Sequence, residues 1–106
     1  MKAKLTRKEL EAVHLAIKAG LHQSEPENMA DKLLYELVDN INYRIESKLR
    51  KAEQGNKTSG NISFNSIESR ALHCWYLSVQ NLVSRSFMYE DIVTTRLIHE
   101  IDRIYA

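Results

Sequence analysis

The chain has few of the residues that break regular structure, because its 106 residues include only three glycines and one proline. A β-sandwich or barrel of this length would need many tight turns, and such turns rely on glycine and proline. The scarcity of both residues therefore favours helices. The length leaves room for one hydrophobic core, so we expect a single domain that spans residues 1–106.

Cysteine and long apolar runs are also scarce. The single cysteine, Cys74, excludes an internal disulfide bond and is typical of a reducing compartment. No apolar run approaches the roughly 18 residues that a membrane-spanning helix needs, and the charged start Met1–Lys4 has no signal-peptide core. We therefore expect a cytoplasmic protein with no membrane partner. Cys74 follows Ala71 by three residues, which places both on one apolar face of a predicted helix. We therefore expect the thiol to be buried.

The longest periodic segment lies between Ser24 and Gly55. Ser24, Pro26 and Glu27 are typical of a helix start, with Ser24 as the cap and Glu27 closing a capping box. Gly55 is placed to take the left-handed conformation that ends a helix. About 28 residues would form a rod of roughly 42 Å, so other helices or a second copy must cover its length. Its apolar residues share one face: Ala30, Leu33, Leu34, Leu37, Val38, Ile41, Ile45, Leu49 and Ala52.

Three further segments are predicted to be helical. A capping box at Thr6–Glu9 marks one helix start and opens a helix of about 14 residues. Asn65 or Ser66 can cap the next helix, with Glu68 three residues after Asn65. The acidic pair Glu90–Asp91 suits the first turn of a last helix, after a break around residues 84–89. The polar stretch 56–61 is a loop, and the two apolar residues that follow it are too few for a strand.

These segments predict an all-α fold, a four-helix antiparallel (up-down-up-down) bundle built on the long second helix. A fold of three helices, in which the last two segments merge, is the alternative.

The net charge of +1 implies no partner by itself, so only the placement of charge matters. In an antiparallel bundle, the starts of the first and third helices would share one end with the tail of the second. Eleven basic residues, Arg70 among them, and seven acidic residues would meet there, a net charge of +4, and the other end would carry −3. The basic end is either a solvated surface or a docking patch for nucleic-acid phosphates or an acidic protein. No aromatic residue interrupts Lys48–Lys51, so contact with a nucleic acid would be to its backbone and sensitive to salt. The candidate binding residues are Lys4, Arg7, Lys8, Arg44, Lys48, Arg50, Lys51 and Lys57.

No convergent catalytic set is visible in the sequence. Glu11 and His14 have the spacing of carboxylate-bridged metal sites in helical bundles, but the required second copy of the motif is missing. Arg96 and His99 could bind a phosphate and move a proton, although an exposed helix face explains them more simply. We therefore expect no cofactor and no metal, and favour a protein that is not an enzyme. A small hydrolase, nuclease or metal protein is the remaining alternative.

Several large apolar side chains fall off the predicted core faces. They are either scattered exposed residues or a contact surface for a second copy or another protein. Our first hypothesis is accordingly a non-enzymatic helical interaction module, a small regulatory protein that binds a protein partner or self-associates. The second is a nucleic-acid-associated accessory protein that uses the basic end. The candidate interface residues are Tyr43, Leu77, Phe87, Met88 and Tyr89.

Overall fold

The computed structural model describes residues 1–105 and is mostly helical, which confirms the predicted class. α3 and α4 are separate helices, so the three-helix alternative is wrong. The order of elements is β1 (Lys2–Thr6), α1 (Arg7–Gln23), α2 (Met29–Gln54), β2 (Ser59–Ser63), α3 (Ser66–Ser84) and α4 (Met88–Tyr105).

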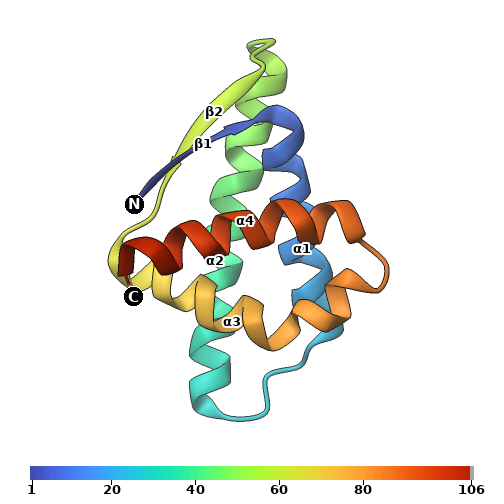
Figure 1. Cartoon of the computed structure of the whole chain (residues 1–106), viewed down its shortest axis with the longest axis vertical. Coiled ribbons are helices and arrows are strands. Elements are labelled where there is room, and N and C mark those ends of the chain that lie inside the picture. The colour runs from blue at the N-terminus through green and yellow to red at the C-terminus, as the bar shows by residue number, and fades with distance from the viewer. Residues whose placement is uncertain (106) are drawn as a thin grey trace.

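The four helices form two pairs that cross each other. α1 and α2 lie side by side along the long axis of the molecule, and α3 and α4 run across them (Figure 1). The expected alignment of all four helices in an up-down-up-down bundle is therefore not confirmed. The reason is the connection after α2: β2 runs back along the molecule, so α3 begins beside the middle of α2 rather than at its end (Figure 1).

The two strands were not predicted, and the expectation of a fold without strands is wrong. β1 and β2 pair in antiparallel fashion, in a register that runs from Lys2 opposite Ser63 to Thr6 opposite Ser59. Ile62 is buried, while Ala3 and Leu5 are half-buried against the core. Strands of this length are not stable alone, so their pairing depends on the helices beneath them.

Two helix starts are confirmed in detail. The Thr6 side chain accepts a hydrogen bond from the Glu9 backbone N–H, and the Glu9 carboxylate accepts one from the Thr6 N–H. Asn65 and Glu68 form the same reciprocal box at the start of α3. Each box satisfies backbone donors that the first turn of a helix leaves without a partner.

The predicted start of the long helix is wrong, whereas its predicted end, with Gly55 directly after the last turn, is confirmed. α2 is capped by Asn28, whose side chain accepts from the Asp31 N–H, and Ser24 instead ends α1 by donating to the Gly20 carbonyl. α1 is accordingly longer than expected, at 17 residues. Gly55 has a φ of −87°, and the left-handed conformation is taken by Asn56, with a φ of 52°.

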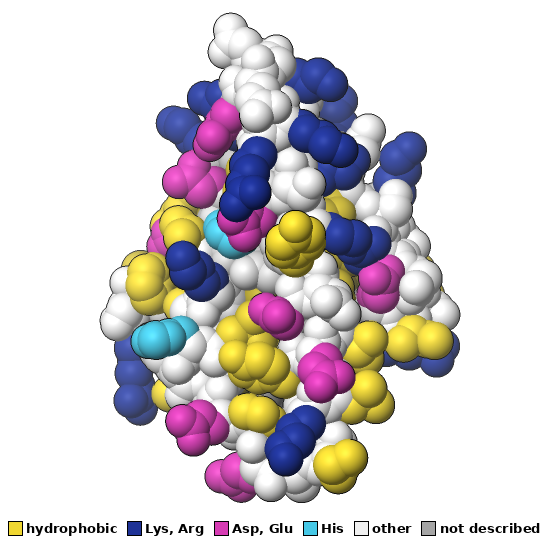
Figure 2. All heavy atoms as spheres, turned by 180° about the vertical axis from the view of Figure 1, so that it is seen from behind, with side chains coloured by type: hydrophobic (Ala, Val, Ile, Leu, Met, Phe, Trp, Pro, Cys, Tyr) yellow, Lys and Arg dark blue, Asp and Glu magenta, His cyan; other side chains and the backbone are white. Residues whose placement is uncertain are grey.

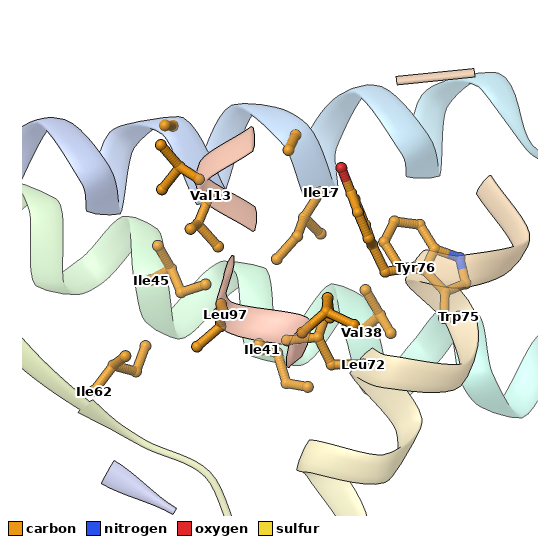
Figure 3. Packing of buried hydrophobic residues seen from close by; sticks show 14 of the residues in the cluster. Val13, Ile17, Val38, Ile41, Ile45, Ile62, Leu72, Trp75, Tyr76 and Leu97 are labelled. Atoms are coloured by element: carbon orange, nitrogen blue, oxygen red, sulfur yellow. The ribbon is translucent and has the colours of Figure 1, made fainter. Parts of the chain in front are cut away.

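The core lies where the two helix pairs cross. Figure 3 shows apolar side chains of α1, α2, α3, α4 and β2 pointing toward one another. Gly20 lets α1 approach α3 closely, because a Cβ at this position would lie 2.7 Å from the Cη2 atom of Trp75. Cys74 is exposed, so the prediction of a buried thiol is wrong. The labelled core residues are Val13, Ile17, Val38, Ile41, Ile45, Ile62, Leu72, Trp75, Tyr76 and Leu97.

No helix within residues 1–105 combines the length and the apolar character that crossing a membrane requires.

Candidate functional site

Four of the predicted basic residues line one hollow at the end of α2, which we call the basic hollow. It has a volume of about 330 Å³ and is bounded by the start of α1, the end of α2 and the segment that leads into β2. No carboxylate is among its lining residues. Those residues are Arg7, Leu10, Lys48, Lys51, Ala52, Lys57, Ser59, Gly60 and Asn61.

Backbone hydrogen bonds fix the frame of the basic hollow. The Lys57 N–H donates to the Ala52 carbonyl at 2.8 Å, which holds the segment after α2 against the last turn of that helix. The Arg7 N–H donates to the Thr58 carbonyl at 2.8 Å and joins the same segment to the start of α1. Three parts of the chain are thereby tied together, so the basic side chains project from one common rim.

The four basic side chains of the basic hollow are exposed, so their charges are accessible to a ligand. Among residues 1–105, no carboxylate forms an ion pair with Arg7, Lys48 or the other two cations of the hollow. Figure 2 shows Lys and Arg side chains crowded over the upper end of the molecule, where α2 ends, with a few carboxylates among them.

The other four predicted binding residues lie outside the basic hollow. Arg44 pairs with Glu68 at 2.6 Å, and Arg50 pairs with Glu46 one turn earlier on the same helix. Lys4 and Lys8 line two different grooves, beside α4. These residues add to the local positive charge, but the structure does not bring them into one cavity with the first four.

The expectation that the starts of α1 and α3 share one end of the molecule with the end of α2 is only half fulfilled. Arg70 of α3 lies 5.9 Å from the ring centre of Tyr105, in a pocket that also contains His73 and Asp102. These residues come from the start of α3 and the end of α4. Both parts lie away from the end of α2 (Figure 1). The residues that were predicted to give one end a charge of +4 are therefore divided between two places.

The predicted interface residues lie on three different helices. Tyr43 is 70% exposed on α2 and Leu77 is 55% exposed on α3, whereas Phe87 packs against the core at the turn before α4. Met88 is exposed at the start of α4. Tyr89 lines a groove of about 430 Å³ that also contains Leu15 of α1.

Each of the two residue pairs with candidate chemistry, Glu11 with His14 and Arg96 with His99, has one member that bonds another side chain. His14 Nδ1 lies 2.9 Å from the side-chain oxygen of the buried Asn42, which accounts for a polar residue in that position. Arg96 pairs with Glu9 at 2.8 Å. Within residues 1–105 there is no group of three or more His, Cys, Asp or Glu side chains that could hold a metal ion.

A polar network joins α3 to the first turns of α4. The Tyr76 hydroxyl donates to Asp91 at 2.6 Å, Thr95 donates to the same carboxylate, and Gln80 donates to Thr95. Burial raises the pKa of Tyr76 far above its usual value, and the adjacent Asp91 carboxylate adds to the effect. Tyr76 therefore remains a neutral donor, and we assign the network to the packing of the two helices.

Sequence reasoning missed the wall that β2 contributes to the basic hollow. The alternation of polar and apolar residues in Lys2–Thr6 and in Asn61–Phe64 is the signal that could have found both strands.

No family model matches the chain, and comparisons with curated proteins and with solved structures find no match.

Proposed function

We propose that this protein is a non-enzymatic binding module that holds a nucleic acid by its phosphate backbone at the basic hollow. The observation that carries the proposal is the convergence of Arg7, Lys48, Lys51 and Lys57 on one cavity without a carboxylate among the lining residues.

The chemistry of the basic hollow fits phosphate better than it fits a base. Lysine acts as a point charge on a flexible stem, which suits a phosphate whose position varies along a polymer. A concave surface lined by charge of one sign also concentrates the field and attracts an opposite charge. No aromatic side chain lines the hollow, so bases have no stacking platform there. We therefore expect binding with little dependence on sequence.

Salt dependence is the direct test of this proposal. Fluorescence anisotropy would measure the affinity of the protein for a labelled 20-base-pair DNA duplex between 50 and 200 mM salt. If the cations of the hollow replace counterions on about four phosphates, the affinity should fall on the order of 100-fold over this range. A flat salt profile, or no binding at the lowest salt concentration, would contradict the proposal.

Two variants with the same change of charge locate the binding site. Lys51→Glu lies at the basic hollow, whereas Lys32→Glu lies on the same helix about 28 Å away, well beyond the Debye length of ~10 Å at 0.1 M salt. Lys51→Glu should reduce affinity about tenfold and lower the salt slope, and Lys32→Glu should change affinity by about twofold or less. Equal losses from both variants would assign binding to overall charge and not to the hollow.

A second candidate function is self-association through the first turns of α2. None of residues 29–37 is buried, and Met29 and Leu33 are 80% and 59% exposed. A second copy that packs its own α2 against this surface would cover them. Sedimentation at micromolar concentration tests this candidate: Leu33→Ser should shift a dimer toward the monomer, and Ile104→Ser, at an exposed position of α4, should not. A wild-type protein that sediments as a monomer would remove this candidate.

A further inference from the structure

The outer edge of β1 has backbone groups without a hydrogen-bond partner. Two bonds at the ends of the ribbon, from the Phe64 N–H to the Met1 carbonyl and from the Arg7 N–H to the Thr58 carbonyl, fix which residues of β1 bond β2. They are the odd-numbered residues, so Lys2 and Lys4 direct their N–H and C=O groups away from β2.

Thr6, the next even-numbered residue, shows that a backbone group on the outer edge can form a hydrogen bond. The Thr6 N–H also points away from β2, and it donates to the Glu9 carboxylate. Within residues 1–105, the backbone groups of Lys2 and Lys4 have no such partner. An open edge of this kind is a template for another extended strand.

A groove runs along this open edge, between β1 and α4. It has a volume of about 280 Å³, and Leu5, Val93 and Leu97 contribute apolar lining. Its two carboxylates already have partners, because Glu9 pairs with Arg96 and Glu100 pairs with Arg103. Lys2 and Lys4 also line the groove, and both residues are exposed.

The positive charge of Lys2 and Lys4 determines which kind of strand can pair with the outer edge of β1. A second copy of β1 would bring lysines opposite lysines, and like charges across a strand pair are destabilising. In an antiparallel addition, side chains opposite Lys2 and Lys4 share their outward face, so acidic residues suit these positions. The residue between them shares the face of Ala3 and Leu5 and points toward the apolar lining.

We propose that the edge of β1 binds an extended segment of a partner protein in which acidic and apolar residues alternate. The segment adds as an antiparallel third strand of the ribbon and lies in the groove beside α4. This site is separate from the basic hollow and does not rest on the binding of nucleic acid.

The experiment uses a fluorescein-labelled peptide in which Glu and Val alternate, titrated against the full chain and followed by anisotropy. We expect saturable binding that falls about tenfold or more when the Glu residues are N-methylated, because their N–H groups face β1. N-methylation of the Val residues, whose N–H groups face away, is the matched control and should leave binding within about twofold. Unimpaired binding of the Glu-methylated peptide, or no binding of the parent peptide, would overturn the proposal.

Two protein variants test the same site from the other side. Lys4→Pro removes the outward N–H and keeps the bonds between β1 and β2, because proline is tolerated where the N–H of an edge strand faces outward. It should weaken peptide binding about tenfold while the circular dichroism spectrum is unchanged. The double variant Lys2→Glu, Lys4→Glu should prefer a peptide in which Lys and Val alternate. If that variant still preferred the acidic peptide, the proposal would be wrong.

Discussion

The two halves of α2 carry the same apolar repeat and have different surroundings. In the second half, from Val38 to Ala52, the face formed by this repeat is buried. In the first half, residues 29–37, no residue is buried, because neighbouring helices cover this segment only in part: Leu34 and Tyr35 line a pocket with Trp75 of α3. The comparison teaches that a repeat predicts which face of a helix is apolar, whereas its burial depends on where the neighbouring elements cross.

The two halves also differ in the chemistry that they present. The second half contributes Lys48 and Lys51 to the basic hollow. The first half contributes Asp31 to a pocket that also contains Glu25 and Trp75. The same helix thus offers cations to a partner at one end and apolar and acidic groups at the other.

The two halves of α2 should differ most in how much a substitution lowers the free energy of unfolding. Ile45→Ala, at a fully buried position, should lower the free energy of unfolding by about 2–5 kcal/mol. Leu33→Ala, at an exposed position of the same helix, should change it by about 0.5 kcal/mol or less. Urea denaturation of the monomeric protein measures both values. Similar losses in the two variants would mean that the first half is covered in solution.

A smaller effect is expected at the helix caps of the two ends. Thr6→Ala removes the cap of α1, beside the basic hollow, and should lower the free energy of unfolding by about 1 kcal/mol. Asn28→Ala removes the cap of α2 and should cost less, because the uncovered first turns can unfold locally without exposing the core. Hydrogen exchange provides the second measurement, since amides in residues 29–37 should exchange faster than those of the second half. A larger loss for Asn28→Ala than for Thr6→Ala would contradict this ranking.

The smallest effect concerns Glu9, the carboxylate of the α1 capping box. The Thr6 backbone N–H holds the pKa of Glu9 below its usual value of 4.5, and Arg96 acts in the same direction. The ionised form therefore stabilises the folded protein above this pH, and the stabilisation is lost as the pH falls below 4.5 toward the folded-state pKa.

Glu9→Gln should accordingly destabilise the protein by about 0.5 kcal/mol or less at pH 7, because solvent screens the charge. The difference from the wild type should shrink below pH 4.5, as measured by urea denaturation across pH. A difference that grows on acidification would show that the sign is wrong. The variant also removes a negative charge from the basic end of the molecule, so DNA affinity should rise slightly.

Local signals in the sequence predicted the start of a helix well where only one capping box was present. Thr6 with Glu9 and Asn65 with Glu68 start helices as expected, and the break before α4 is present without a glycine or proline. At the start of α2 two signals competed, and Ser24 ended the first helix while Asn28 began the next. Ser24 could serve either role by its chemistry, and in the structure both its side chain and its backbone N–H donate to the Gly20 carbonyl.

The strands and the crossing of the helix pairs depend on contacts between distant parts of the chain. β1 pairs with residues more than 50 positions away, so no local pattern fixes its partner. The basic hollow was predictable in part, since adjacent antiparallel helices bring Arg7 near Lys51. The loss of Arg70 from that end and the pairing of Arg44 with Glu68 follow from the position of α3, which the sequence pattern did not specify.

A backbone amide NMR titration of the ¹⁵N-labelled protein with the DNA duplex tests, residue by residue, whether nucleic acid binds at the basic hollow. We expect the largest chemical-shift changes at Arg7, Lys51, Lys57 and Gly60, around the basic hollow, and no response from residues 29–37. Changes centred on residues 29–37, or spread evenly over the surface, would contradict this expectation.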